Sequence, residues 1–279
     1  MTPSRLFALC LAVVVVGACG DDDQLGAPAP VAGMRFINAV GDTGSMDLRV
    51  VDIVGDAPQF LVNTFRAFTP YQAVTAGTRR MRVFMTPSKT DTVVGAPLMW
   101  DTTFTFTAGT NYSVIMTGFA RPCPTPPQAC APRMQMLVTQ DPAADPGVGQ
   151  VAIRVIHAGA DTLVPAIDAY QRRTGAAPGA PLLTSLAFGS AGAYTAFAAD
   201  TPTMRVAVTP AGSGTVLVDV LGPPGVAGTP SANPIAGTNV AGSVLTGIFV
   251  PAAVAGSPAP AGAATIVYVA DRRPAMTVP

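Results

Sequence analysis

Glutamate is absent from the sequence, and all 16 acidic residues among its 279 residues are aspartate. Because glutamate is the commonest general acid of exported hydrolases, its absence excludes most glycosidase mechanisms unless two aspartates serve. The chain has one histidine, His157, through which every histidine-dependent mechanism would have to pass. It also lacks a Gly-x-Ser-x-Gly elbow, a glycine-rich phosphate loop and a metal-binding His-Glu pattern. The sequence therefore predicts a protein that is not an enzyme and carries no cofactor or metal.

Charge is scarce as well. Charged residues make up 11% of the chain, and 16 basic residues balance 16 acidic ones without forming a polybasic run. Binding to a phosphate backbone needs a concentrated cationic face, so nucleic acid is excluded as a partner. The same balance gives no electrostatic attraction to anionic lipid. Hydrophobic residues reach 49%, which is enough to bury a core.

Long helices are not expected. The 28 glycines and 28 prolines are spread along the chain, and beyond residue 19 no stretch free of both exceeds about eleven residues. Those stretches lack the apolar spacing of a helix. Frequent turns between short strands explain this distribution, so the sequence predicts an all-β fold.

The N-terminal residues predict export and lipid attachment. Residues 1–18 have a positive charge followed by an apolar run, as in a secretory signal peptide. Gly17-Ala18-Cys19 resembles the bacterial lipobox, which implies acylation of Cys19 and cleavage before it. An ordinary signal peptide with an incidental cysteine is the alternative. Because Gly20 is not the aspartate that retains enterobacterial lipoproteins, the resemblance favours the outer membrane.

Residues 19–33 combine charge, proline and glycine, which is typical of a flexible tether. The run Asp21 to Asp23 within it lacks the rigid cage that a metal site needs. Cys123 and Cys130 lie in a proline-rich segment. In an oxidising compartment we expect a disulfide between them, since neither a Cys-x-x-Cys motif nor further zinc ligands are present.

The chain contains an internal duplication. Residues 34–43 (MRFINAVGDT) match residues 153–162 (IRVIHAGADT), which places Asn38 opposite His157. Two copies of a unit of about 120 residues follow, a normal size for a domain. Further matches pair 46–48 with 167–169, Phe68 and Tyr71 with Phe188 and Tyr194, 81–83 with 204–206, 108–111 with 236–239, and Asp141 with Asp271.

The sequence pattern of each copy predicts β-strands. Residues 103–107 alternate strictly between threonine and phenylalanine, the period of a half-buried strand. Seven or eight such runs per copy predict an immunoglobulin-like antiparallel β-sandwich, although the immunoglobulin Cys, Trp and Cys signature is missing. We therefore expect tandem sandwiches at residues 34–145 and 146–279, following the signal peptide and the tether.

The second copy begins with Arg-Val-Ile-His157-Ala-Gly-Ala-Asp161, followed by Ile-Asp168-Ala-Tyr. This opening resembles the bacterial DUF4397 family, a secreted domain of unknown function, and Ala-Gly-Thr-Asn-Tyr-Ser-Val at 108–114 resembles a later motif of that family. The first copy departs by having Asn38 at the histidine position. The resemblance covers most of residues 34–271 and implies a β-sandwich in a surface-associated protein, without an activity.

The repeated polar residues have two interpretations. His157 could act in a Ser-His-Asp hydrolase with Asp161 or Asp168, but Asn38 in the other copy cannot shuttle a proton. Hydrogen bonding to the backbone at a strand end is common to both side chains and is favoured. Asp42 and Asp161 precede threonine in turns, whereas Asp47 and Asp168 lie inside strands. Each pair is expected to be structural, because calcium would want six or more oxygens.

The last candidate binding residues are Trp100 and the cluster Arg79, Arg80 and Arg82. An exposed tryptophan beside basic residues could bind polysaccharide or peptide, but a single tryptophan among apolar neighbours is more often packed. The sequence thus predicts a cell-envelope lipoprotein held by the lipid on Cys19, whose sandwiches serve binding of a protein or glycan, adhesion or scaffolding. The alternatives are an accessory subunit of a secreted enzyme or transport system and, less favoured, a hydrolase using His157.

Overall fold

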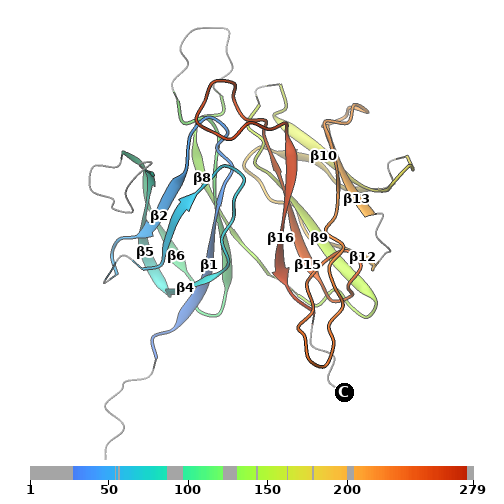
Figure 1. The fold of residues 1–279 in the computed structure, drawn as a ribbon, viewed down its shortest axis with the longest axis horizontal. Helices are drawn as coiled ribbons and strands as arrows, with labels where there is room; N and C mark the ends of the chain where they lie inside the picture. Colours follow the sequence, from blue (N-terminus) through green and yellow to red (C-terminus); the bar gives the residue numbers. More distant parts are fainter. Residues whose placement is uncertain are drawn as a thin grey trace, which may run out of the picture. The chain divides into compact units, whose positions relative to one another are not determined.

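The computed structural model describes residues 28–53, 55, 57–86, 97–121, 131–142, 144–161, 163–177, 179–199 and 204–274. Within these ranges the protein is all-β and has no helix (Figure 1). It follows that the described residues include no helix long and apolar enough to cross a membrane. The predicted fold class is confirmed.

The first half of the chain forms two four-stranded sheets, with the strand orders β4-β1-β7-β8 and β3-β2-β5-β6. Their inner faces enclose one hydrophobic core, so together they make a β-sandwich, called here the first sandwich. Its strands are β1 (Val31–Asn38), β2 (Met46–Val50), β3 (Gln59–Asn63), β4 (Gln72–Thr75), β5 (Gly77–Met85), β6 (Leu98–Phe106), β7 (Asn111–Thr117) and β8 (Gln135–Gln140).

The second half repeats this topology as the second sandwich. Its sheets have the orders β12-β9-β15-β16 and β11-β10-β13-β14, so each strand has a counterpart at the same place in the first sandwich. A second hydrophobic core lies between these two sheets. The strands are β9 (Gln150–His157), β10 (Ala166–Arg173), β11 (Pro181–Ala187), β12 (Thr195–Ala198), β13 (Met204–Pro210), β14 (Val218–Leu221), β15 (Val244–Val250) and β16 (Thr265–Arg272).

Strand pairing is antiparallel with one exception in each sandwich. β1 pairs with β7 in parallel, and β9 pairs with β15 in the same way. The sequence pattern predicts antiparallel sandwiches, so these two parallel pairs depart from the prediction. A parallel neighbour requires a long crossover, and here the crossover consists of the strands between β1 and β7.

The register corrects two details of the internal alignment. Tyr71 and Tyr194 do correspond, but the bridges Ile37↔Phe68 and Ile156↔Ala191 make Ala191 the counterpart of Phe68, where the alignment had used Phe188. Likewise, Gly33 pairs with Asn111 while its counterpart Ala152 pairs with Val244. The segment equivalent to 108–111 is therefore 241–244, and the similar residues 236–239 belong to an insertion between β14 and β15.

A third hydrophobic cluster joins the sandwiches. In β1, Met34 and Phe36 face the core of the first sandwich, while Ile37 on the opposite face belongs to this third cluster. Ile156 of β9 is its counterpart from the second sandwich. The sheets that contain β1 and β9 are thus covered on both faces, and residues 31–279 form one compact unit. The cluster consists of Ile37, Ala39, Ile115, Ile156, Ala158, Ile248, Val250 and Val269.

Candidate functional site

Two arginines lie inside this junction between the sandwiches. Arg35 in β1 and Arg154 in β9 each have apolar neighbours in sequence, and strand alternation turns both toward the opposite sandwich. Arg35 is 2% exposed and Arg154 is 5% exposed. A buried guanidinium requires a counter-charge and partners for its five N–H groups, which the junction supplies.

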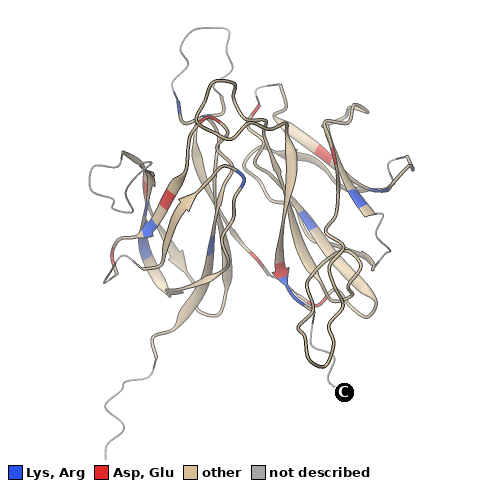
Figure 2. Ribbon diagram, in the orientation of Figure 1, with Lys and Arg blue, Asp and Glu red and all other residues tan. Residues whose placement is uncertain are grey.

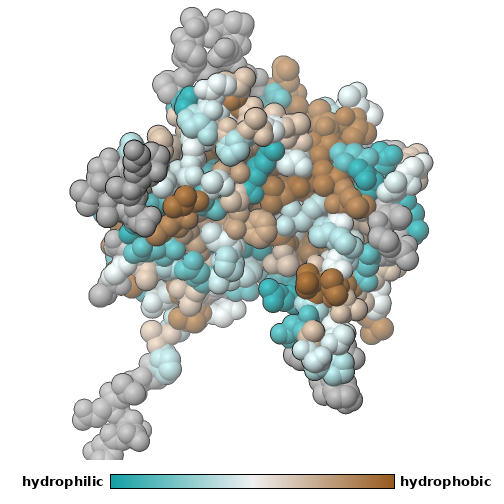
Figure 3. All heavy atoms as spheres, viewed as in Figure 1, coloured by the Kyte–Doolittle hydropathy of each residue, from teal (hydrophilic) through white to brown (hydrophobic). Residues whose placement is uncertain are grey.

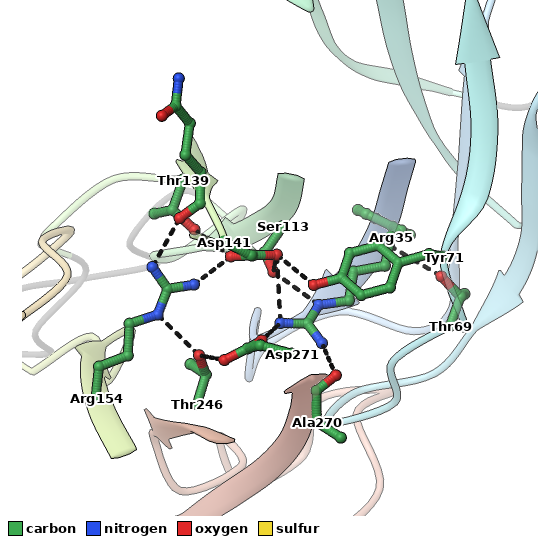
Figure 4. A network of polar contacts seen from close by, with 12 residues as sticks. Arg35, Thr69, Tyr71, Ser113, Thr139, Asp141, Arg154, Thr246, Ala270 and Asp271 are labelled. Atoms are coloured by element: carbon green, nitrogen blue, oxygen red, sulfur yellow. Dashed lines mark hydrogen bonds and ion pairs between the residues drawn. The ribbon is translucent and has the colours of Figure 1, made fainter. Parts of the chain in front are cut away.

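Arg35 binds one carboxylate at the end of each sandwich (Figure 4). Its guanidinium forms an ion pair with Asp271, the last residue but one of β16 in the second sandwich, and lies 3.4 Å from an oxygen of Asp141, which directly follows β8 of its own sandwich. Its Nε donates to Ser113 Oγ over 2.7 Å, and Nη1 donates to the carbonyl of Ala270 over 3.0 Å. Arg35 therefore joins the two sandwiches.

Arg154 makes the corresponding contacts from the second sandwich to the first. Its guanidinium forms an ion pair with Asp141 of the first sandwich, and its Nε donates to Thr246 Oγ1 over 2.8 Å. Nη1 donates to the carbonyl of Gln140 over 2.8 Å. The corresponding partners in the two copies are Arg35 and Arg154, Ser113 and Thr246, Asp141 and Asp271. Each sandwich thus gives an arginine to the carboxylate of the other, as across a two-fold axis.

Each of the two aspartates also accepts a hydrogen bond from a tyrosine. The hydroxyl of Tyr71 donates to Asp141 over 2.6 Å and that of Tyr194 donates to Asp271 over 2.8 Å. Arg35 stacks on the Tyr71 ring at 4.7 Å, and Arg154 stacks on the Tyr194 ring at 4.8 Å. Burial raises the pKa of both tyrosines well above their ordinary value, so the hydroxyls stay protonated as donors.

The network holds two positive and two negative charges and so is neutral as a unit. Burial raises the pKa of Asp271, against the opposing effect of Arg35. Ser113 donates to Asp141 over 2.7 Å and Thr246 donates to Asp271 over 2.5 Å, which supplies further partners for both carboxylates. The carboxylate oxygens of the network all have hydrogen-bond or ion-pair partners, and both aspartates are more than nine-tenths buried. We therefore infer that the network fixes how the two sandwiches pack against each other.

His157 and Asn38 occupy equivalent places, and both bond to the backbone two residues ahead and to a carbonyl of another segment. His157 Nε2 lies 3.1 Å from the carbonyl of Val164, and its Nδ1 accepts from the Gly159 N–H over 3.3 Å. Asn38 donates to the carbonyl of Asn63 over 3.0 Å, and its side-chain oxygen accepts from the Val40 N–H over 3.1 Å. Both side chains are fully buried. Each connects the end of its strand to the backbone of a neighbouring segment.

Desolvation lowers the pKa of His157 to about 4, so the ring is neutral at pH 7. Its bonds assign the proton to Nε2, because that nitrogen faces a carbonyl while Nδ1 accepts. The rings of Phe188 and Phe249 flank the imidazole at 5.6 and 5.5 Å between centroids. Its hydrogen bonds are to backbone groups and include no Asp161 or Asp168 carboxylate, so the structure offers no Ser-His-Asp arrangement at this residue.

Asp47 and Asp168 each hold a bulge in the neighbouring edge strand. Asp47 Oδ1 accepts from the Val62 N–H over 2.7 Å, and Asp168 Oδ1 accepts from the Ser185 N–H over 2.7 Å. Val62 and Ser185 both have a left-handed backbone, with φ of 52°. Bonds to the backbone N–H groups of Ser185 and Gly212 lower the pKa of Asp168. These carboxylates hold an unusual backbone in place.

Asp42 and Asp161, the two aspartates predicted to lie in turns, bind different backbone groups. Asp42 accepts from the backbone of Ala120 over 3.1 Å and of Arg121 over 2.8 Å, which fastens the segment after β7. Asp161 accepts from Leu163 two residues ahead over 2.8 Å. Among the described residues, no group of three or more His, Cys or Asp side chains could hold a metal ion.

The tryptophan and the arginine cluster lie apart from these residues. Arg80 and Arg82 both form ion pairs with Asp101, and they hold the pKa of that carboxyl at about 2. Arg79 pairs with Asp52 at 3.7 Å. Trp100 packs partly buried against the core of the first sandwich. Cys19, Cys123 and Cys130 lie outside the described residues.

A pocket of about 370 Å³ lies where the loops of both sandwiches meet. The first sandwich contributes Phe119, and the second contributes Phe249, Leu217 and segments 159–161 and 251–254. Gly159 is required here, because a Cβ at this position would overlap the Phe249 ring. No sequence pattern indicates this pocket, because it depends on how the two copies pack.

The first sandwich also positions the loop that forms one wall of the pocket. Arg66 Nη2 donates to the carbonyls of Pro251 over 2.9 Å and Gly262 over 3.1 Å, and the Val254 N–H donates to Gly41 over 2.8 Å. Exposed apolar side chains surround the opening. Figure 3 shows hydrophobic side chains gathered above β16 and beside β10. Leu217 and Val254 in the lining are exposed, as are Leu163 and Val216, which adjoin lining residues in the sequence.

A known family matches part of the chain. The model of DUF4397, a domain of unknown function, matches residues 32–170, and the chain belongs to this family. That range begins in β1 and ends in β10, so it includes both arginine-bearing strands. No curated protein matches the chain.

Proposed function

We propose that the protein is a non-enzymatic lipoprotein of the cell envelope that binds an apolar group of another envelope protein in the pocket at Phe119 and Phe249. The pocket, which is shared between the sandwiches and has the exposed Leu217 and Val254 in its lining, is the observation that carries this proposal. Its volume is within the usual range for binding sites, and its lining is largely apolar. An exposed apolar patch on a soluble domain is typical of an interaction site.

The position of the pocket supports this role. The chain enters β1 at Val31, at the opposite end of that strand from the turn at Gly41, which contacts the pocket's loop. A lipid on Cys19 would therefore hold the protein by the end remote from the pocket. We place the anchor in the outer membrane and include a disulfide between Cys123 and Cys130 and a second copy of the family domain at residues 146–279 in this proposal.

Catalysis has less support than binding. The polar side chains that recur in both copies bond to backbone groups or to each other inside the protein, and His157 is neutral and enclosed by apolar rings. A glycan ligand is less suited to the pocket, because sugar recognition needs several directed polar groups and Asp161 is the one charged residue in the described part of the lining.

Site-specific crosslinking in the native host tests the binding role. A photoreactive benzoylphenylalanine replaces Leu217, which lines the pocket just before β14, or, as the control, Leu221 at the far end of β14. These side chains are 39% and 43% exposed, so they offer matched access. We expect a discrete adduct with an envelope protein from position 217 alone. Absence of an adduct there, or equal adducts from both positions, would contradict the proposal.

The identity of the captured protein separates the remaining alternatives. A subunit of an exported enzyme or transporter would favour the accessory-subunit function. A structural envelope protein would favour scaffolding. Lipid attachment is tested independently by mass spectrometry of the N-terminal peptide, which we expect to begin at Cys19 and carry acyl chains, and by Cys19→Ser, which should release the protein from the membrane fraction.

A further inference from the structure

The connection between β14 and β15 is an insertion found in the second sandwich alone. In the first sandwich, β6 ends at Phe106 and β7 begins at Asn111, whereas β14 ends at Leu221 and β15 begins at Val244. The additional residues form a hairpin. Val226 and Ile235 exchange two backbone hydrogen bonds of 2.9 Å, and a second bridge joins Thr229 and Ala232.

The base of the hairpin is fixed to the sandwich. The Thr238 N–H donates to the Pro223 carbonyl over 2.8 Å, and the Gly242 N–H donates to Gln150 at the start of β9 over 2.7 Å. Gly225, with φ of 74°, lies so close to Gly237 that neither position has room for a side chain. These contacts make the hairpin a defined protrusion on the folded domain.

This protrusion presents apolar side chains to solvent and carries no charge. Val226 and Ile235 pair with each other across the hairpin, and their exposed fractions are 58% and 61%. The sequence has no charged residue from Val220 to Ala270. In Figure 2 the loop that descends between β14 and β15 is accordingly free of blue and red. Moving such an uncharged surface from water into a lipid interface costs little free energy, because no charged group has to be desolvated.

The hairpin lies at the end of the protein where the tether enters. β1 and β9 carry equivalent arginines into one network, so Val31 and Gln150, which begin these strands, are at the same end. Figure 1 shows the hairpin, the lowest orange loop, at that end. Val148 between the sandwiches is fully exposed there as well. Cys19 precedes Val31 by only 12 positions in the sequence.

Positive charge accompanies these apolar side chains. β16 runs back to this end and finishes with Arg272, followed by the exposed Arg273. Gly242 at the base of the hairpin lies against Pro274, so the arginines and the hairpin are neighbours. Arg272 pairs with Asp145 at 2.9 Å, whereas the structure assigns Arg273 no ion pair within the described residues. An arginine beside inserted apolar groups suits the phosphates of a membrane surface.

We propose that the Val226–Ile235 hairpin inserts into the headgroup region of the membrane that holds the lipid anchor, and so keeps the pocket facing away from the bilayer. This inference rests on the proposed lipid attachment at Cys19. The occupant is the bilayer surface. A protein bound to the hairpin in its place is an outcome that the following test would detect.

Depth-dependent quenching tests this inference. The lipidated protein carrying Val226→Trp is reconstituted into vesicles of phosphatidylethanolamine and phosphatidylglycerol, with or without bromine on the acyl chains near the headgroup. The unsubstituted protein supplies the constant signal of Trp100. We expect bromine to reduce the added emission by about half, as for a side chain 5 to 10 Å deep in the interface.

The matched control is Leu163→Trp, at an apolar residue 85% exposed near the pocket, whose emission should not respond to bromine. Vesicle flotation, measured in parallel, reports the anchor itself. Flotation with unquenched Trp at position 226 would overturn the hairpin inference and leave lipid attachment intact. If instead the native protein does not float, a mature chain held through an N-terminal polyhistidine tag on nickel-chelating lipid repeats the measurement, so the hairpin is still tested.

Val226→Ser combined with Ile235→Ser gives the converse result. Without its apolar side chains the hairpin should leave the interface, so a Trp introduced at neighbouring Ala227 should lose its quenching relative to the same Trp in the parent hairpin. Circular dichroism establishes that the double variant keeps its strands. Unchanged quenching in a folded double variant would contradict the inference, as would quenching that depends on an added envelope protein.

Discussion

The guanidinium of Arg35 in the first strand of one sandwich binds the carboxylate of Asp271 in the last strand of the other. Arg154 returns the contact by binding Asp141. Two copies of one fold are thus joined by exchanged ion pairs, much as two subunits meet across a two-fold axis. Phe119 of the first sandwich and loops of the second sandwich line one shared pocket.

Removal of one buried arginine should be strongly destabilising. Arg35→Leu leaves Asp271 buried without its cation, and we expect the free energy of unfolding to fall by about 3 to 5 kcal/mol. Urea denaturation followed by circular dichroism measures this loss. Arg80→Leu, which removes an exposed ion pair with Asp101, is the control and should cause a far smaller change. Equal losses in the two variants would show that the network contributes no more than a surface pair.

The arginine and aspartate should also be coupled energetically. Asp271→Asn removes the charge that Arg35→Leu leaves unpaired, so the double variant should lose less stability than the sum of the two single losses. A double-mutant cycle measures this difference. Additive losses would mean that the ion pair between the sandwiches is not the source of the effect.

His157 should make stability depend on pH. Its pKa is near its ordinary value of 6.5 in the unfolded chain and about 4 in the folded protein, so between these values the unfolded chain binds the extra proton. Stability from this residue is complete above pH 6.5 and decreases as the pH falls toward 4, by about 3 kcal/mol in total.

His157→Asn is the control, because it introduces the residue that the first copy already has as Asn38. The pH dependence between 4 and 6.5 should become flatter by the histidine contribution, and any activity of the protein should persist. Urea midpoints across this range measure the effect. An unchanged slope would contradict the assignment of a buried neutral imidazole, and loss of a catalytic activity from the folded variant would revive the hydrolase alternative.

The strained backbone at Val62 offers a stabilising substitution. A β-branched residue at φ of 52° is unfavourable, whereas asparagine tolerates this region. Val62 is half exposed, so Val62→Asn should raise the free energy of unfolding by about 1 kcal/mol. Leu61→Asn, one residue earlier in the same strand and without positive φ, should give no gain. A Val62 variant that is no more stable than the parent would show that the bond from Asp47 already offsets the strain.

Sequence patterns predicted the strands and the repeat, because alternation and turn residues act over a few positions. Residues 103–106 of the alternating run fall in β6, and Tyr71 corresponds to Tyr194 and Asp141 to Asp271, as aligned. The alignment was wrong at Phe68 and at residues 236–239, where a short match in letters competed with an insertion that strand register alone reveals.

The junction between the sandwiches was not predicted. One signal for it was present, since Arg35 and Arg154 each interrupt an apolar strand at the same position of the repeat. A charge inside an otherwise buried strand requires a partner, which could have suggested the repeated Asp141 and Asp271. That each arginine binds the carboxylate of the opposite copy depends on packing between distant segments, and no local pattern encodes it.

Calorimetry of the mature chain tests most directly whether the two sandwiches form one unit through the exchanged ion pairs. The structure predicts a single unfolding transition whose calorimetric enthalpy equals its van't Hoff enthalpy. Two resolved transitions, or a calorimetric enthalpy about twice the van't Hoff value, would mean that the sandwiches unfold independently and would contradict the account.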